Sequence, residues 1–114
     1  DSACIDVDAV DVLVHGHVHL GDRRDAIERW CLTLLEALLA FQNADGGFAD
    51  VREGVRRQDG WVRGYEEPQG LSNSFATWFR WIAIAMIADL LWPGRRNWRF
   101  RRMVGIGYRR QPAR

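Results

Sequence analysis

The spacing of apolar residues predicts two helices joined by a short turn in the first half of the chain. Apolar side chains recur at steps of three and four residues from about residue 6 to 19 and again from 23 to about 43, which is the period of one helix face. Gly21 and Asp22 interrupt this pattern, and Asp22 is the expected N-cap of the second helix. The two apolar faces consist of Val7, Val10, Leu13, Val14 and Val18, and of Ile27, Trp30, Cys31, Leu34, Leu35, Leu38 and Phe41.

A third helix is expected over residues 75–91, where the chain is apolar on almost every side. One of the polar residues 72–74 can cap its start, and the pair Pro93-Gly94 ends it. The apolar run reaches the lower length limit of a membrane-spanning helix, but it contains Arg80 and Asp89. We therefore expect a buried core helix with neighbours on most sides rather than a transmembrane span.

The segments between and around these helices indicate loops, so the predicted fold class is all-α. Residues 49–70 are polar and contain four glycines and Pro68, which is typical of a long loop; short strand-like pieces are expected around Trp61 and Val62. Three helices with such wide apolar faces do not obviously close a core alone. We expect a fragment of a helical-hairpin repeat or toroid that is incomplete on its own.

The composition narrows the class of protein. A chain of 114 residues with 47% hydrophobic content is one domain at most, and this excludes a disordered, collagen-like or disulfide-dense protein. Cys4 and Cys31 are expected to act as small apolar side chains, which favours a reducing compartment. The acidic start lacks the cationic region of a signal peptide. The expected location is cytoplasmic, with association to a membrane surface as an alternative.

The net charge of +1 is a cancellation between two unlike halves. Residues 1–50 hold ten acidic and three basic side chains, whereas residues 51–114 hold five acidic and thirteen basic ones, and every basic residue is arginine. An arginine-rich tail at 95–114 has eight Arg and no acid, interleaved with aromatics. Nucleic acid is one partner for such a tail. Because the acidic half can neutralise the basic half, we expect no nucleic-acid partner; a diphosphate or a carboxylated glycan suits the arginines equally well.

Three carboxylates, Asp6, Asp8 and Asp11, crowd the first turns of the first predicted helix. They can hold a divalent cation such as Mg²⁺, or their repulsion can keep one of them protonated as a general acid. The alternative is simple complementarity to the helix dipole, which accounts for Asp6 better than for all three. His15 and His19 follow Asp11 at four-residue steps, a spacing that can ligate zinc, although we expect solvated or paired histidines here.

Two segments of the first half of the chain stand out, Asp6-Val7-Asp8-Ala9-Val10-Asp11 and Gln42-Asn43-Ala44-Asp45-Gly46-Gly47-Phe48. They resemble motifs of one known superfamily, the α/α-toroid terpene cyclases and protein prenyltransferases. The second segment is similar to the Gln-x-x-Asp-Gly-Gly-aromatic turn that ends their repeats, and the first to the Asp-x-Asp-Asp-Thr-Ala motif that precedes such a turn in squalene-hopene-type cyclases. Together they cover about residues 3–48.

The resemblance implies that residues 1–114 are the C-terminal portion of a single toroid domain that binds or transforms a polyprenyl or other isoprenoid substrate. It places Asp8 at the general acid, with Asp6 and Asp11 tuning it or binding Mg²⁺. Ala9 and Val10 stand where the cyclase motif has Asp and Thr, so the motif is degenerate. Residues 66–80 look more like a region of bacterial proteins that share the toroid repeat.

The turn carries a structural expectation of its own. Its Gln42 and Asp45 can bind free backbone groups at a helix end, Gly46 and Gly47 permit a sharp bend, and Phe48 packs on the next hairpin.

Two further function classes remain open at the level of sequence. Toroids also serve carbohydrate hydrolases and lyases, which use carboxylates as acid and base and aromatic rings as sugar platforms. A non-catalytic helical scaffold that binds a partner chain is the third class. The candidate substrate-binding residues are Trp61, Tyr65, Trp78 and Arg80, and the loop residues Glu66 and Glu67 are weaker candidates.

Overall fold

All three predicted helices are present in the computed structural model, which describes residues 2–52, 56–58, 65–67 and 70–95. They are α1 (Ala3–His19), α2 (Arg24–Leu39) and α3 (Ser74–Leu91). Two short strands, β1 (Arg56–Gln58) and β2 (Tyr65–Glu67), pair antiparallel, with Arg56 opposite Glu67. The described residues are therefore mainly helical, as the all-α prediction expected. The strand-like pieces were expected at Trp61 and Val62, which lie outside the described residues.

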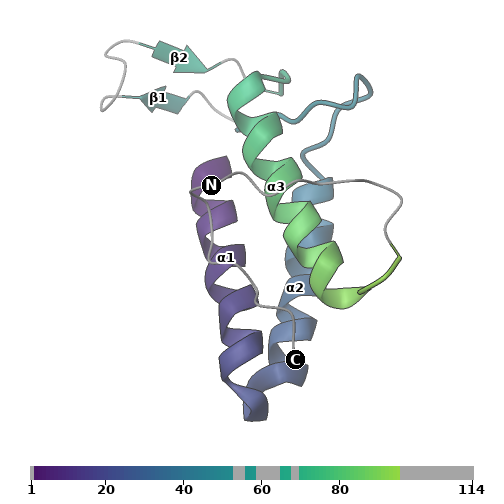
Figure 1. Ribbon diagram of the computed structural model, residues 1–114. Coiled ribbons are helices and arrows are strands. Elements are labelled where there is room, and N and C mark those ends of the chain that lie inside the picture. Colours follow the sequence, from purple (N-terminus) through teal and green to yellow (C-terminus); the bar gives the residue numbers. More distant parts are fainter. Residues whose placement is uncertain (1, 53–55, 59–64, 68–69, 96–114) are drawn as a thin grey trace.

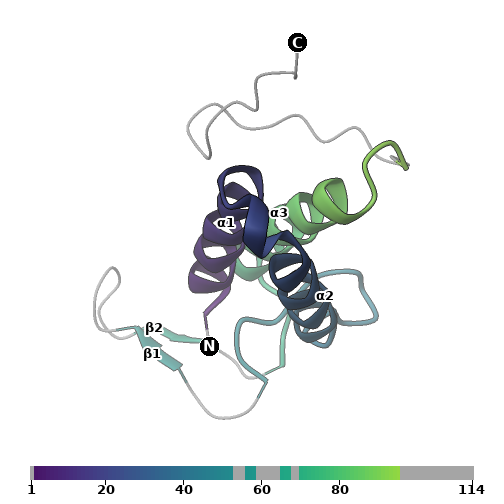
Figure 2. The ribbon, with the colours of Figure 1, turned by 90° about the horizontal axis from the view of Figure 1, so that it is seen from below.

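The helices form a small bundle in which α3 lies across an antiparallel hairpin of α1 and α2 (Figures 1 and 2). The 3-10 turn η1 (Gly21–Arg23) connects the two arms of the hairpin. At this closed end His17 Nε2 lies 2.8 Å from Glu28 Oε1, and Arg24 Nε donates to the carbonyl of His17 at 3.2 Å. The β1–β2 ribbon lies at the opposite end, near the start of α1 (Figure 1).

The ends of the first two helices differ from the prediction. α1 begins at Ala3 rather than near Asp6, because the carboxylate of Asp50 accepts the Ala3 N–H at 2.7 Å and so caps the helix from a distant segment. Asp22 was expected to cap the second helix, but it lies inside η1 and makes no such bond. α2 ends at Leu39, four residues earlier than predicted, in tight turns.

The start of α3 confirms one of the predicted caps. The side chain of Asn73 accepts the N–H of Ala76 at 2.7 Å, which satisfies a backbone donor that has no partner inside the helix. Trp92 ends the helix, and Gly94 follows with a φ of 94°, a left-handed conformation that glycine adopts without strain. The predicted stop at Pro93-Gly94 is therefore correct.

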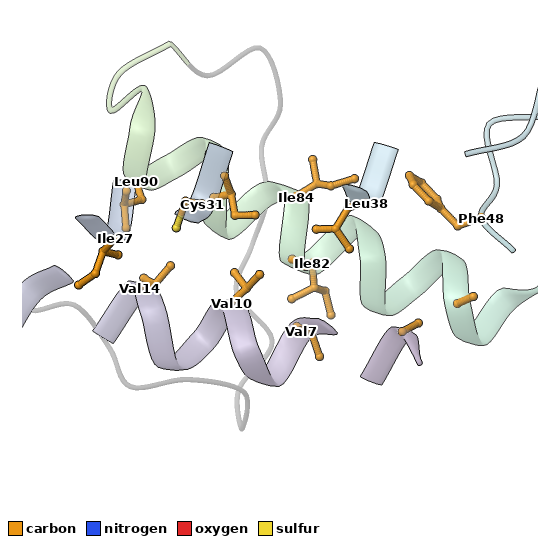
Figure 3. Packing of buried hydrophobic residues seen from close by; sticks show 14 residues of the cluster. Val7, Val10, Val14, Ile27, Cys31, Leu38, Phe48, Ile82, Ile84 and Leu90 are labelled. Atoms are coloured by element: carbon orange, nitrogen blue, oxygen red, sulfur yellow. The ribbon is translucent and has the colours of Figure 1, made fainter. Parts of the chain in front are cut away.

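The core fills the space between the three helices, and Figure 3 shows its side chains pointing toward one another. Most of the predicted apolar stripe of α1 is buried, but the α2 stripe is narrower than predicted. Trp30 is 63% exposed and Val18 is 40% exposed, so these two members of the predicted apolar faces lie outside the core. The labelled core residues are Val7, Val10 and Val14 of α1, Ile27, Cys31 and Leu38 of α2, Phe48, and Ile82, Ile84 and Leu90 of α3.

Both cysteines are free, and Cys31 is fully buried. Burial raises the pKa of its thiol, and the nearby charge of Glu28 raises it further. A neutral, buried thiol is the small apolar side chain that the sequence indicated for this position.

α3 passes the length and composition test for a membrane span, with a mean hydropathy of 1.4 over its 18 residues. A buried core helix passes the same test. The consecutive residues 82–85 are all buried, so packing in the bundle accounts for the apolar composition of the helix centre.

Candidate functional site

Arg80 forms the centre of a buried polar cluster at the crossing of α1 and α3. Its side chain has no solvent exposure. Its Nε and Nη2 atoms donate to Oδ2 of Asp6 at 3.3 and 3.1 Å, and Nη2 also donates to the carbonyl of Asp50 at 3.2 Å. The guanidinium carbon lies 3.8 Å from the centre of the Phe41 ring. We call these four residues, Arg80, Asp6, Asp50 and Phe41, the Arg80 cluster.

The Arg80 cluster joins three segments of the chain that are distant in sequence, namely α1, α3 and the segment after α2 that contains Phe41 and Asp50. Asp50 contributes from the loop after α2, and its carboxylate lies at the positive end of the α1 dipole, where a negative charge is favourable. Nη1 of Arg80 is buried and makes no hydrogen bond within the described part of the chain. A cation enclosed by a carboxylate, a carbonyl and an aromatic face is the arrangement of an anchoring ion pair.

The predicted turn at residues 42–48 folds back on itself and docks beside this cluster. Asn43 N–H donates to the Gly47 carbonyl, and Gly46 N–H to the Asn43 carbonyl, both at 2.9 Å. Gly46 has a φ of 84°, which favours glycine. A Cβ on Gly47 would lie 2.7 Å from the Cβ of Ser72, so this position has no room for a side chain. Both glycines are therefore required, for different reasons.

A polar triad of side chains closes the turn against the loop before α3. Ser72 Oγ donates to Asp45 Oδ1 at 2.8 Å, and Asn43 Nδ2 donates to Ser72 Oγ at 2.9 Å. The hydrogen bond from Ser72, supported by the N–H of Gly47, lowers the pKa of Asp45. Asp45 thus binds the neighbouring loop and its own turn.

Gln42 and Asp45 were expected to bind free backbone groups at a helix end, but two carbonyls there are bound by a side chain from outside the turn. Arg52 donates from Nη2 to the carbonyls of Ala40 and Gln42, and its guanidinium lies 5.9 Å from the centre of the Phe41 ring. The Gln42 amide instead donates to the carbonyl of Gly46 at 3.3 Å, inside the turn.

Phe48 anchors the end of the turn to α3. It is fully buried, and its ring meets Trp81 edge to face at a centroid distance of 5.6 Å. Its N–H donates to Thr77 Oγ1 at 2.9 Å, and its carbonyl accepts the Asn73 N–H at 3.1 Å. The aromatic residue of the turn was expected to pack on a following hairpin, and in the described part of the chain it packs on the following helix, α3.

The three aspartates of the first helix point in different directions. At about 100° per residue, Asp8 lies roughly 200° around α1 from Asp6. Asp6 binds Arg80, Asp8 is exposed, and Asp11 Oδ1 lies 3.4 Å from Nδ1 of His15. In the described part of the chain, no group of three His, Cys, Asp or Glu residues is arranged to hold a metal ion. The structure brings Asp6 and Arg80 together but not the three carboxylates.

The structure describes two of the three aromatic residues that the sequence suggested for substrate binding, Tyr65 and Trp78. Trp61 lies outside the described residues, and Tyr65 is the first residue of β2. Trp78 lies on the first half of α3 together with Phe75 and Trp81, and these three side chains are 40%, 43% and 41% exposed. We call them the aromatic face of α3. Phe79 supports them, because its ring packs edge to face against Phe75 at 4.7 Å and against Trp78 at 4.8 Å.

The sequence indicated the turn at residues 42–48, Asp6 and Arg80, but it did not indicate the residues that contact them. Asp50, Arg52 and Ser72 lie in polar loop segments, where nothing in the local pattern distinguishes a buried anchor from a solvated side chain.

Comparison of the chain with protein-family models, with curated proteins and with solved structures found no matching family, protein or structure.

Proposed function

We propose that this chain binds an apolar ligand of the isoprenoid class on the aromatic face of α3, as part of a protein built like an α/α toroid. The observation that carries this proposal is the exposure of Phe75, Trp78 and Trp81 together on one helix. With about 40% of each side chain accessible, they expose roughly 250 Å² of aromatic surface. Large aromatic side chains that are exposed together on one helix offer a surface on which an apolar ligand can pack.

The packing beneath the aromatic face supports a preformed platform. Trp81 packs edge to face on the buried ring of Phe48, and the ring of Phe79 packs edge to face against Phe75 and Trp78. The Arg80 cluster fixes the same helix to α1 through two hydrogen bonds to Asp6. Side chains held in this way lose little conformational entropy when a ligand binds, which favours affinity.

The chemistry of the face favours an apolar ligand over a sugar. Glycoside cleavage requires two carboxyl groups on either side of the bond that breaks. Asp6, the described candidate carboxylate that reaches α3, is held by Arg80, and Arg80 itself is fully buried. The face therefore presents rings rather than paired acids.

The toroid part of the proposal is supported by apolar side chains on the outer faces of the hairpin. Several large residues of α1 and α2 are exposed and suit packing against further helices. These residues are Ile5, Val12, Trp30, Leu32 and Leu39.

The experiment measures binding of farnesyl diphosphate and of an oligosaccharide to the whole chain by calorimetry. Trp78→Ala should weaken binding of farnesyl diphosphate by about 30-fold, because the lost contact area is worth roughly 2 kcal/mol. Trp30→Ala is the matched control, since Trp30 is 63% exposed but lies on α2. Circular dichroism checks that both variants remain folded.

The outcomes separate the three function classes. Binding of farnesyl diphosphate that is lost in Trp78→Ala and kept in Trp30→Ala supports the proposal. Preferential binding of the oligosaccharide favours the glycan class, and binding of neither probe favours a scaffold. The role of Asp8 as a general acid stays a prediction: Asp8→Asn should abolish turnover of the substrate while binding remains, and retained turnover removes that role.

A further inference from the structure

A second surface of the bundle lies on α2, on the side of the helix opposite to the core. The buried residues Ile27, Cys31 and Leu38 point from α2 into the core (Figure 3). The opposite side is exposed and combines apolar with charged side chains, and we call it the outer face of α2. The outer face consists of Arg29, Trp30, Leu32, Thr33, Glu36, Ala37 and Leu39.

The two charges of the outer face have a regular place on the helix. Arg29 and Glu36 are seven residues apart, so at about 100° per residue they lie on one line along α2, separated by about 10 Å. Both are exposed, and within the described residues neither forms an ion pair. Leu32 and Thr33 lie midway between them. The outer face therefore has a positive and a negative position on either side of an uncharged centre.

We propose that the outer face of α2 binds the same face of a second copy of this chain, with the two helices antiparallel about a twofold axis. A twofold contact uses one patch twice, so it needs a patch that is complementary to itself. When Arg29 lies opposite Glu36 of the second copy, Glu36 lies opposite the second Arg29, and both charges of each copy are paired. A parallel pair would instead bring Arg29 against Arg29 and Glu36 against Glu36, which repulsion between like charges disfavours.

The same register brings apolar side chains together. Leu32 lies close to the centre of the contact and meets Leu32 of the second copy, because a twofold axis places equivalent flanks of the two helices side by side. On the other flank Trp30 meets Ala37 of the second copy, a small residue that leaves room for the indole ring. The register that pairs the charges is therefore also the one that covers the exposed apolar residues.

The size of the outer face indicates a weak dimer. Trp30, Leu32 and Leu39 are 63%, 44% and 45% exposed. Together they present roughly 300 Å² of apolar side chain in each copy. With the polar side chains around them, two copies bury about 1,000 Å² in total, which is near the lower limit for specific interfaces. We expect a dissociation constant on the order of 10 µM.

The dimer does not depend on the proposed ligand site, because the aromatic face belongs to α3 and the outer face to α2. In the toroid proposal a neighbouring hairpin covers the large apolar residues of α2. A second copy supplies a covering helix of the same kind. The self-complementary order of Arg29 and Glu36 favours the second copy, because a hairpin of different sequence does not require it.

The experiment measures sedimentation equilibrium of the whole chain, from about tenfold below to about tenfold above the expected dissociation constant. R29E and E36R should each weaken the dimer at least tenfold, because each variant places like charges opposite one another at two symmetric positions. The double variant R29E/E36R exchanges the charges and should restore the dimer to within about threefold of the original. R95E is the matched control, since Arg95 is exposed beyond α3, and should leave the dissociation constant unchanged.

A second pair of variants tests the apolar contacts. L32A should weaken the dimer about tenfold, because two equivalent side chains lose their contact. V12A is its control and should have no such effect, since Val12 is 70% exposed but lies on α1. Circular dichroism checks that all variants remain folded.

Restoration of the dimer in R29E/E36R, with R95E unchanged, supports the proposal. Equal losses in L32A and V12A, or a double variant as weak as the single ones, would overturn it. A chain that is monomeric at every concentration would also overturn it and would assign the outer face to a neighbouring hairpin. Farnesyl diphosphate binding is measured separately: a monomer that binds it overturns only the dimer, and a dimer that binds neither probe overturns only the proposed function.

Discussion

Removing Asp6 should destabilise the fold more than removing Arg80, although both belong to the same ion pair. The reason is the difference in burial: the side chain of Arg80 has no solvent exposure, whereas 25% of the Asp6 side chain is exposed. Asp6→Asn leaves a buried guanidinium without its counter-charge. Arg80→Met leaves a carboxylate that water can reach and replaces the buried charge with an apolar side chain of similar length.

The magnitudes follow from what each variant leaves behind. Breaking a buried pair so that one charge stays buried costs about 3–5 kcal/mol, so Asp6→Asn should lose about 3 kcal/mol. Arg80→Met should lose about 1–2 kcal/mol, from the contact with Phe41 and the bond to the Asp50 carbonyl. The double variant D6N/R80M should be no less stable than Arg80→Met alone, because it removes both charges of the Asp6–Arg80 pair. The loss in Asp6→Asn is large, since a whole domain is stable by only about 5–15 kcal/mol.

The assay is urea unfolding of all four proteins followed by circular dichroism, with the free energies compared at equal m values. Asp8→Asn serves as the control, because Asp8 is exposed on the same helix and should change stability by less than about 0.5 kcal/mol. If Asp6→Asn costs less than Arg80→Met, or if the two single effects simply add in the double variant, the ion pair does not anchor α1 to α3 and the reasoning fails.

Three further predictions concern the turn and the core. Gly47→Ala should destabilise the chain by about 1–3 kcal/mol in thermal unfolding, because the added Cβ would meet Ser72. Gly21→Ala is the control: its added Cβ would meet no atom within 4 Å, so it should change thermal stability little. The lowered pKa of Asp45 stabilises the fold above the pKa that Asp45 has in the unfolded chain, and this contribution is lost as the pH falls through the folded-state pKa. Ser72→Ala removes the hydrogen bond that lowers this pKa, so the free energies of unfolding of the chain and of Ser72→Ala, measured against pH, should converge at low pH. Parallel curves would contradict this prediction. Cys31, fully buried and with a raised pKa, should react with a thiol reagent only as fast as the chain unfolds, while the other cysteine reacts sooner, and equal rates would contradict the described burial.

The helices could be predicted from the sequence because their periodicity is local. The apolar steps at Val7, Val10 and Val14 indicate one helix face whatever packs against it. The start of α1 could not be predicted in the same way, because its cap is the side chain of Asp50, 47 residues away. Trp30 belongs to the predicted apolar face of α2 but is exposed, for a related reason. Periodicity shows which residues share a helix face, but the width of the face that is buried depends on the neighbouring helices.

The turn was the most predictable part of the candidate site, and its partners were the least. Gly46 and Gly47 mark a bend in any context. The sequence does not indicate that Ser72 lies against Gly47, or that Arg52 binds the carbonyls of Ala40 and Gln42 at the end of α2. These contacts depend on how the loop after α2 returns to α3, which is a tertiary property.

Arg80 shows how tertiary structure changes the interpretation of a charged residue. In sequence it stands in an apolar helix, where it counts against a membrane span and suggests contact with a substrate. In the structure its bonds to Asp6 and Asp50 fix the start of α1, and Asp6 is thereby engaged in an ion pair. The acid mechanism implied by the resemblance needs Asp8 to work beside neighbouring carboxylates, but Asp6 faces Arg80 and Asp11 lies beside His15. The proposed function is therefore binding on the aromatic face of α3 rather than acid chemistry at Asp8.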